Sequence, residues 1–265
     1  MNDILEQSDV EKKITELNNK FDRLKKEQLS VIKEQIRRRG LVDLIFLSEE
    51  ILGAWNLGKI HKEWALVIDK FWKDKNSDLL LFLVSRGFLK SSLITANWII
   101  QRILENPNIR VLIANEKEDN AKKFLGIIRN QFENNKMLHY VYGDFTSKIS
   151  KWTEHEFTVG NRTKTLKEPT VMIGSIDKSP VSLHVDLIIE DDLQSRINTQ
   201  TKAQIDKVHQ YHRDLLSLLE PGGKRCVVAT RWDFDDVYSR IIRSFDENDI
   251  INGEPATEEF KKKFI

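Results

Sequence analysis

The segment that most restricts the possible folds is a short apolar run followed at once by a polar loop and a helix. Residues 79–84 are all apolar, and a polar residue bounds them on each side. A run this short and this apolar is typical of a strand buried on both faces of a parallel sheet. Residues 91–105 then have a helical pattern that ends before Asn106-Pro107. Strand, loop and helix in this order predict an α/β fold whose loop lies at the carboxyl edge of the sheet.

The loop itself has the residues that bind phosphate at a helix N-terminus. It reads Ser85-Arg86-Gly87-Phe88-Leu89-Lys90-Ser91-Ser92. In a phosphate-binding loop, Lys90 would reach the β and γ phosphates and Ser91 would be a ligand of Mg²⁺. The standard pattern G-x-x-x-x-G-K-[ST] has glycines where this chain has Val84 and Leu89. The alternative is an ordinary helix start with a solvated lysine.

A second segment joins an apolar strand to three acids. Residues 185–189 precede Glu190, Asp191 and Asp192. Adjacent carboxylates at a strand end can hold a hydrated metal and orient an attacking water. We expect Asp191 to bind Mg²⁺ and Asp192 to orient the water, with Glu190 as the fallback for the second role. Strand alternation predicts that Glu190 and Asp192 point away from the face of Asp191. The alternative is an acidic loop without a catalytic role.

A third segment ends a strand in a hydroxyl and a guanidinium. The expected strand 225–230 leads into Arg231-Trp232, and Thr230 and Arg231 could sense a γ-phosphate. The alternative is a strand end with a surface arginine. Along the chain, the strand before the loop is followed by an intervening strand, then by the acidic strand, and last by the strand that ends in Thr-Arg. This is the order found in P-loop ATPases that have an additional strand between the two nucleotide motifs. We expect the acidic and Thr-Arg strands to flank the loop strand in space.

The remaining chain alternates strands with helices and begins with a helical region. Strands are expected at 110–114 and 170–174, helices at 117–134 and 200–219, and an inserted hairpin at 152–159 and 162–167 with Gly160-Asn161 as its turn. Residues 4–38 predict a helix that ends at Gly40, and residues 42–74 predict two more helices separated near 56–58. Apolar residues of the first helix follow a spacing of alternately four and three: Val10, Ile14, Leu17, Phe21, Leu24 and, further on, Val31. This helix either packs on its own domain or is a coiled-coil arm for a partner.

Composition excludes several classes of protein. Lys and Arg number 42 and Asp and Glu 41, so the net charge of +1 provides no strong field toward polyanions, and any nucleic-acid contact needs a local patch. No apolar run approaches the length of a membrane span, the first residues do not form a signal peptide, and Cys226 is the single cysteine. We expect a soluble intracellular protein without an intrachain disulfide.

Together the three segments resemble the ATPase domain of the large terminase subunit of tailed bacteriophages, the motor that packages the viral genome. Members of that family typically have an Arg-Gly-x-x-Lys-Ser/Thr loop, a strand ending Ile-Ile-x-Asp-Asp or Asp-Glu, and a Thr-Arg-Trp segment followed by acids. The matching residues are 86–91, 188–192 and 230–236, and the resemblance spans roughly residues 60–245. It implies an α/β P-loop ATPase of the additional-strand class with N-terminal helices. It divides the chain into a helical region at 1–58, the ATPase domain at 59–245, and a linker or end at 246–265.

The resemblance also implies cofactors, partners and residue roles. ATP and Mg²⁺ would bind at Arg86, Gly87, Phe88, Leu89, Lys90, Ser91, Ser92, Asp191, Thr230 and Arg231, with Arg86 acting in cis. A neighbouring subunit of a ring would supply a further arginine, for which Arg196, Arg213 and Arg162 are candidates. The partners would be double-stranded DNA, the portal protein and the small terminase subunit, in the cytoplasm of an infected bacterial host and without a membrane. A nuclease domain is expected in the whole protein but not in this chain. The alternatives are a helicase-like DNA translocase and a nucleotide-binding assembly module with little turnover.

Overall fold

The computed structural model describes residues 2–54, 57–147, 152–178, 183–247, 250–251 and 254–255. Its N-terminal part contains α1 (Asn2–Val42), α2 (Leu44–Phe46), the π-helical segment η1 (Leu47–Ile51) and α3 (Lys59–Lys73). The central part contains β1 (Leu79–Leu83), the π-helical segment η2 (Ser92–Trp98), α4 (Ile99–Glu105), β2 (Val111–Asn115), α5 (Glu118–Asn134), α6 (Lys136–Tyr142), β3 (Glu156–Phe157), β4 (Val171–Ser175) and β5 (Val185–Asp191). The last part contains α7 (Lys202–Leu216), β6 (Leu219–Ala229), α8 (Val237–Glu247), β7 (Ile250–Ile251) and β8 (Glu254–Pro255).

A six-stranded sheet forms the centre of the fold, in the order β1-β6-β5-β2-β4-β3. All neighbouring pairs are parallel except β3 with β4. The prediction of an α/β fold with a mostly parallel sheet is therefore confirmed. The expectation that both strands flank the loop strand is wrong in one respect, because β5 does not pair with β1. The Thr-Arg strand β6 lies between them and pairs with both.

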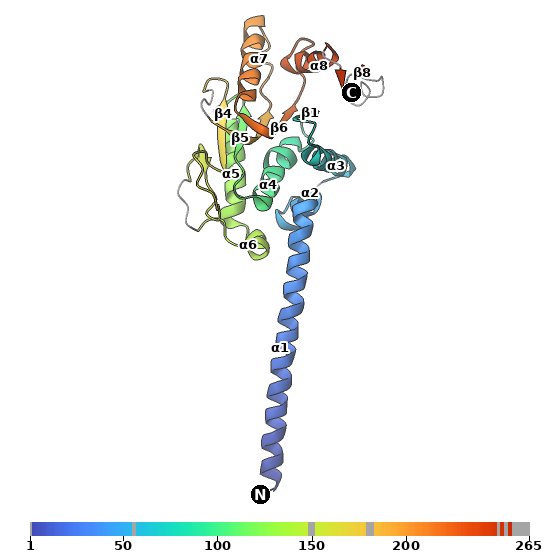
Figure 1. Ribbon diagram of the computed structural model, residues 1–265, viewed down its shortest axis with the longest axis vertical. Helices are drawn as coiled ribbons and strands as arrows, with labels where there is room; N and C mark the ends of the chain where they lie inside the picture. The colour runs from blue at the N-terminus through green and yellow to red at the C-terminus, as the bar shows by residue number, and fades with distance from the viewer. Residues whose placement is uncertain are drawn as a thin grey trace.

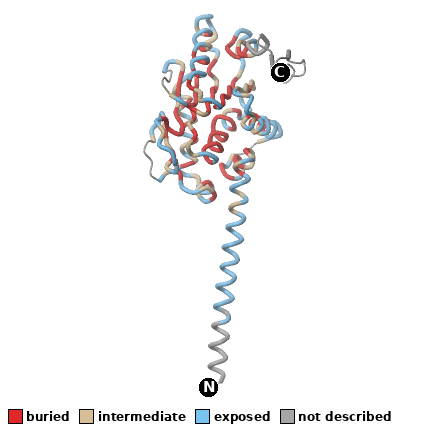
Figure 2. Tube along the Cα trace, viewed as in Figure 1, coloured by how far each residue is buried: buried red, intermediate tan, exposed pale blue. Residues whose placement is uncertain are grey.

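Helices cover both faces of the sheet (Figure 1), and each face has its own apolar core. On one face, side chains such as Ile113 and Ile189 pack with α3, η2, α4 and α5. On the other, Leu112 and Ile188 pack with α7 and α8. This is the period-two alternation of a strand buried on both sides. Figure 2 shows the buried residues concentrated in the sheet and the helices against it.

The first helix runs past the residue expected to end it. α1 includes Gly40, which is buried. A Cβ at Gly40 would lie 2.2 Å from the Tyr142 hydroxyl, which itself donates a hydrogen bond to the Arg37 carbonyl at 3.1 Å. Glycine is therefore required here by the close approach of α6 and not by a helix stop, so the prediction of a helix end at Gly40 is wrong.

Segments 44–52 and 59–73 pack into the body of the protein. Leu47, Ile51 and Leu52 belong to the same core as Trp64 and Phe82. The two predicted helices in 42–74 are present, with the first one split between α2 and η1. The predicted domain boundaries at 58 and 246 stay predictions, and most of residues 246–265 lie outside the described residues.

The predicted hairpin at 152–167 is wrong. Only Glu156–Phe157 forms a strand in this segment, and it pairs with β4 instead of with residues 162–167. Gly160 is not a hairpin turn: its N–H donates to the Phe145 carbonyl at 2.7 Å, and a Cβ there would lie 1.6 Å from the Ser147 carbonyl oxygen. Around Gly160 the segment is held by close backbone approach and not by pairing between its own two halves.

Several other bounds differ from expectation by a few residues. α7 ends at Leu216, and β6 begins as early as Leu219, so Pro221-Gly222-Gly223 lies inside this strand at a register irregularity opposite Val185–Leu187. α8 continues to Glu247. Of the helices in the described part of the chain, none combines the length and apolar character needed to cross a membrane.

Candidate nucleotide-binding site

The predicted phosphate-binding loop connects β1 to a helix that begins at Lys90. Its backbone turns at Gly87, with φ of 87°, and again at Leu89, with φ of 54°. The second value is left-handed, which costs a residue with a Cβ about 1–2 kcal/mol. Leu89 therefore adopts the conformation for which the standard pattern uses glycine. Strain of this kind is common at functional sites, where the surrounding structure maintains it.

His61 of α3 contacts the backbone of the loop through a hydrogen bond. Its Nδ1 accepts a hydrogen bond from the Gly58 N–H at 2.9 Å, so the proton of the neutral ring is on Nε2. That Nε2–H donates to the Phe88 carbonyl at 2.9 Å. Sequence reasoning did not assign His61 a role, because nothing in the local pattern connects α3 to a loop 27 residues later.

Lys90 lies at the point where the three predicted motifs meet. Its side chain is buried, and Nζ donates to Asp192 Oδ2 at 3.1 Å and to Thr230 Oγ1 at 3.2 Å. Thr230 in turn donates from Oγ1 to the Val84 carbonyl at 3.1 Å. Asp192 and Thr230, which lie 102 and 140 positions after Lys90 in the chain, thus contact one ammonium group. The alternative of a solvated lysine does not fit this burial.

Ser91 and Asp191 form a second contact between the start of the helix and the end of β5. Ser91 Oγ donates to Asp191 Oδ1 at 2.7 Å, and Thr95, one helical turn later, donates to the same oxygen at 3.1 Å. Burial raises the pKa of Asp191 to about 6, against the opposing effect of the Ser91 hydrogen bond, and the charge of Asp192 raises the pKa further. Thr95 was missed by sequence reasoning, although its position four residues after Ser91 on one helix face could have indicated it.

Asp192 does not lie where strand alternation placed it. β5 ends at Asp191, and Asp192 has φ of 44°, so its side chain leaves the alternation of the strand. Its Oδ1 accepts from the Thr230 N–H at 3.1 Å while its Oδ2 contacts Lys90. The expectation that Asp192 shares a face with Glu190 is therefore wrong. Leu89 and Asp192 are the two residues other than glycine with positive φ in the described part of the chain.

Glu190, the fallback for orienting water, lies on the opposite side of the sheet from Lys90. It is buried against α7, where His212 Nδ1 donates to Glu190 Oε2 at 2.6 Å. Arg225 of β6 lies 3.6 Å from Glu190 Oε1 and donates to the His212 carbonyl at 3.0 Å. The structure thus pairs Glu190 with two basic residues behind the sheet and does not bring it to the loop.

The arginines predicted near the γ-phosphate have different surroundings. Arg86 is exposed on the loop and stacks on the Trp232 ring, with its Cζ 4.4 Å from the ring centroid. Arg231 points to the start of α8, where it contacts the Ser239 hydroxyl and lies 3.7 Å from Asp236. In this structure, Arg231 is therefore directed away from Lys90.

The three arginines predicted to act in trans also differ. Arg196 is exposed just after the acidic strand, and no partner for its guanidinium is seen among the described residues. Arg213 is on the surface of α7 and donates to Gln210. Arg162 donates to backbone carbonyls, including that of Glu168 at 2.6 Å, and burial lowers its pKa. Its internal bonds leave Arg162 poorly placed to reach a neighbour or a DNA phosphate.

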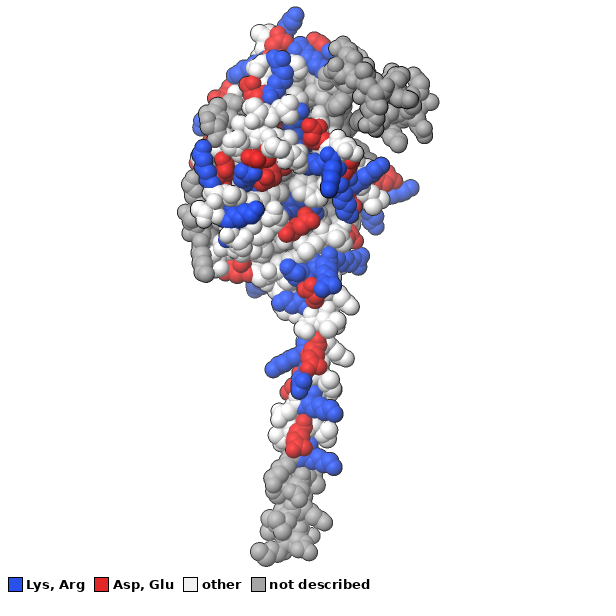
Figure 3. Space-filling model, in the orientation of Figure 1, with Lys and Arg blue, Asp and Glu red and all other residues white. Residues whose placement is uncertain are grey.

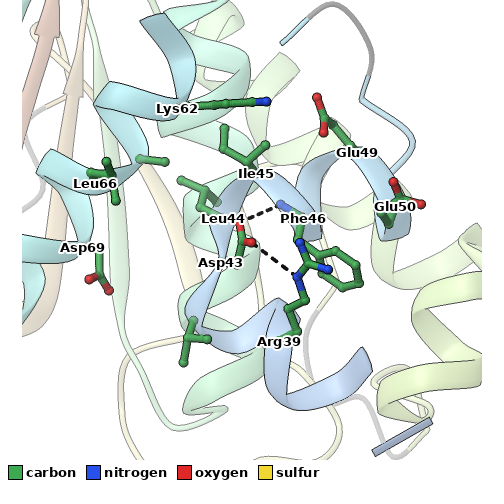
Figure 4. Close-up of a pocket in the computed structure, with 12 residues that line it drawn as sticks. Arg39, Asp43, Leu44, Ile45, Phe46, Glu49, Glu50, Lys62, Leu66 and Asp69 are labelled. Atoms are coloured by element: carbon green, nitrogen blue, oxygen red, sulfur yellow. Dashed lines mark hydrogen bonds and ion pairs between the residues drawn. The ribbon is translucent and has the colours of Figure 1, made fainter. Parts of the chain in front are cut away.

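A hollow of about 280 Å³ lies beside the loop. Leu89, Ser92 and Asn97 line it on the loop side, and residues 52–54 and 57 line it on the other. A larger hollow of about 740 Å³ lies at the foot of α1, between α1, η1 and α3 (Figure 4). No residue of the loop lines the larger hollow, so the smaller one is the hollow adjacent to the predicted phosphate site.

The residues at the loop are suited to a metal held jointly with a nucleotide. Ser91 and Asp191 offer a hydroxyl and a carboxylate, the oxygen ligands that Mg²⁺ uses together with phosphates. No cluster of three or more His, Cys, Asp or Glu side chains that could hold a metal alone is found in the parts of the chain that the structure describes. No protein-family model and no curated protein matches this chain.

Proposed function

We propose that this chain is a Mg²⁺-dependent ATPase of the P-loop class. The observation that carries the proposal is the convergence of three distant segments on the loop. Lys90 contacts Asp192 and Thr230, and Ser91 contacts Asp191. Phosphoryl transfer is catalysed mainly by positioning and by charge, and this arrangement gathers one ammonium, two carboxylates and two hydroxyls at a helix start.

Each of these residues has a proposed role. Ser91 and Asp191 would hold Mg²⁺, which when bound neutralises charge on the phosphate oxygens. Lys90 would stabilise charge on the γ-phosphate as it leaves, and Asp192 would orient the attacking water. Arg86 would add a second positive charge from the loop.

The pairing of Lys90 with Asp192 means that a phosphate must compete with a carboxylate for the ammonium group. Because Asp192 has a second hydrogen bond from the Thr230 N–H, it keeps a fixed position when Lys90 turns to a phosphate. We infer that nucleotide binding transfers Lys90 from Asp192 to phosphate and leaves Asp192 free to accept a proton or orient water.

We further propose that ATP hydrolysis drives the packaging of double-stranded DNA into a phage capsid, in a ring on the portal protein and with the small terminase subunit. This part rests on the resemblance of the three motifs to large terminase subunits. The host cytoplasm as its location is proposed on the same ground. Strand separation of a DNA duplex, rather than its movement, would favour the helicase-like translocase instead.

The test is steady-state phosphate release from ATP with and without Mg²⁺. We expect Lys90→Ala to abolish release, Asp191→Asn to weaken Mg²⁺-dependent nucleotide binding, and Asp192→Asn to keep binding but lose release. Lys75→Ala, at an exposed lysine before β1, is the matched control and should keep full activity. Unchanged release by Lys90→Ala would exclude the P-loop assignment, and a loss in Glu190→Gln alone would move the water-orienting role to Glu190.

A second candidate is an assembly module that binds nucleotide and hydrolyses it little. The observation that favours it is Leu89, whose side chain stands where a phosphate-binding loop has only a hydrogen atom. Nucleotide binding without steady phosphate release in the native chain, with release gained in Leu89→Gly, would support this second function.

A further inference from the structure

Among the residues that the structure describes, the contacts of the long helix α1 with the rest of the protein come from its last turns (Figure 1). The Tyr142 hydroxyl donates to the Arg37 carbonyl at 3.1 Å, and Gln101 Nε2 donates to the Gly40 carbonyl at 2.9 Å. Lys33 lies over the Tyr140 ring at 5.1 Å. The 41 residues of α1 correspond to about 60 Å at 1.5 Å per residue. Most of this length projects away from the sheet.

The projecting part has an apolar seam that its own domain does not cover. Leu17, Phe21, Leu24 and Val31 are 59%, 68%, 49% and 57% exposed. Their spacing places Phe21 at an a position and Leu17, Leu24 and Val31 at d positions of one heptad register, which is the register of a helix paired with another helix. The body contacts α1 through Lys33 and through the b and f positions 36 and 40 instead. The domain therefore docks on the back of α1 and leaves the seam free.

The charged residues beside the seam are complementary to those of a second copy of α1 that runs in the opposite direction. In this register the g positions are Lys13 and Lys20 in the first half and Glu27 and Glu34 in the second. All four side chains are exposed or half-buried. In an antiparallel pair the g positions of the two helices face each other, so Lys20 meets Glu27 and Lys13 meets Glu34, each twice by symmetry.

We propose that α1 forms an antiparallel two-stranded coiled coil with α1 of a second copy of this chain. Phe21 of one helix then packs beside Leu24 of the other at the centre. A parallel pair would instead place Lys20 beside Lys25 of the second copy, a like-charge contact. Figure 3 shows both positive and negative side chains along α1, which is consistent with pairing between two antiparallel copies of the helix. The antiparallel pair places the two ATPase bodies at opposite ends of the rod.

The first test measures the mass of the full chain in solution across the micromolar range. The expected species is a dimer of twice 31.0 kDa. Lys20→Glu should weaken the dimer about tenfold, since two attractive contacts become repulsive. The double variant Lys20→Glu with Glu27→Lys should recover dimerisation, and Lys26→Glu, at an f position off the seam, is the matched control. Far-UV circular dichroism reports whether the helix itself survives each change.

Several outcomes would overturn the proposal. A monomer throughout the range excludes self-pairing and leaves the seam for a different protein. A dimer strengthened by Lys20→Glu is parallel, because that change removes the contact between Lys20 and Lys25. A dimer insensitive to Lys20→Glu forms through another surface.

The second test determines orientation by disulfide cross-linking. In the antiparallel pair position 14 lies opposite position 31 of the second copy. Val31→Cys alone should then not cross-link, because the two cysteines lie about 25 Å apart along the rod, whereas mixed Ile14→Cys and Val31→Cys chains should. Efficient cross-linking of Val31→Cys alone would refute the antiparallel arrangement. The native Cys226 is buried and does not interfere.

Discussion

Replacing Asp191 by asparagine is expected to stabilise the nucleotide-free protein, although the same change removes a proposed metal ligand. The carboxylate is 2% exposed, and burial raises its pKa from 3.8 to about 6. The folded state therefore binds the proton more tightly than the unfolded state. Between these two pKa values the free energy of unfolding falls as the pH rises, and the loss is complete above pH 6.

The magnitude follows from the size of the shift. About two pKa units at 1.36 kcal/mol each give a cost of about 3 kcal/mol at pH 8, which falls to about 1 kcal/mol at pH 4.5. Asparagine carries no charge but keeps an oxygen that accepts from Ser91 and Thr95. We therefore expect Asp191→Asn to be more stable than the native protein by a margin that grows with pH.

The assay is urea denaturation of both proteins from pH 4.5 to pH 8, in EDTA so that no divalent cation binds. Asp177→Asn, at a side chain 82% exposed, is the control and should show no such margin. A margin that is independent of pH, or an Asp191→Asn protein that is less stable at pH 8, would refute the reasoning. Mg²⁺ should reduce the margin, because it stabilises only the native carboxylate.

Three further changes test the packing around the site and at the foot of α1. Gly40→Ala should lower the free energy of unfolding by about 1–2 kcal/mol because its Cβ meets the Tyr142 hydroxyl at 2.2 Å, and Tyr142→Phe should largely relieve that cost in a double-mutant cycle by urea denaturation. Gly160→Ala should cost more than about 3 kcal/mol, since its Cβ would meet the Ser147 carbonyl at 1.6 Å and backbone cannot swing aside; a thermal midpoint near the native value would contradict this contact. His61→Ala should leave the fold intact but weaken nucleotide binding several-fold, because the Phe88 carbonyl loses its donor; equal affinities in a fluorescent-nucleotide titration would show that the loop keeps its shape without His61.

Much of the architecture could be predicted from local pattern. Mostly apolar runs at 79–84, 110–114 and 185–189 correspond to β1, β2 and β5 within a few residues, because strands covered by helices on both faces bury most of their side chains. Parallel strands end at one edge of the sheet, so residues at their carboxyl ends are expected to meet. The structure brings Lys90, Asp191 and Thr230 together there, while their chemical roles stay predictions.

Other features depend on tertiary contacts that the sequence does not display. Gly40 and Gly160 look like a helix stop and a turn, but each is required by an approaching chain segment from elsewhere. The spatial order of β1, β6 and β5 is equally absent from the alternation of strands and helices. Asp192 leaves its expected face because of one backbone angle. His61 has a contact to the loop that only the folded chain reveals, whereas the position of Thr95 one turn after Ser91 could have indicated its contact to Asp191.

The position of β1 in the sheet has a mechanical consequence. Among the described strands β1 has β6 as its single neighbour, paired from Leu79 with Arg225 to Leu83 with Ala229, whereas β6, β5 and β2 are paired on both sides. Through the backbone, β1 and the loop are therefore joined to the sheet by the hydrogen bonds with β6 alone, while the helix after the loop is held by core packing and by the contacts of Ser91 and Thr95 with Asp191. Loss of the hydrogen bonds between β1 and β6 would leave the other strand pairs of the sheet intact. Amide hydrogen exchange should then be faster in β1 than in β5, and occupation of the loop should slow it in β1 first.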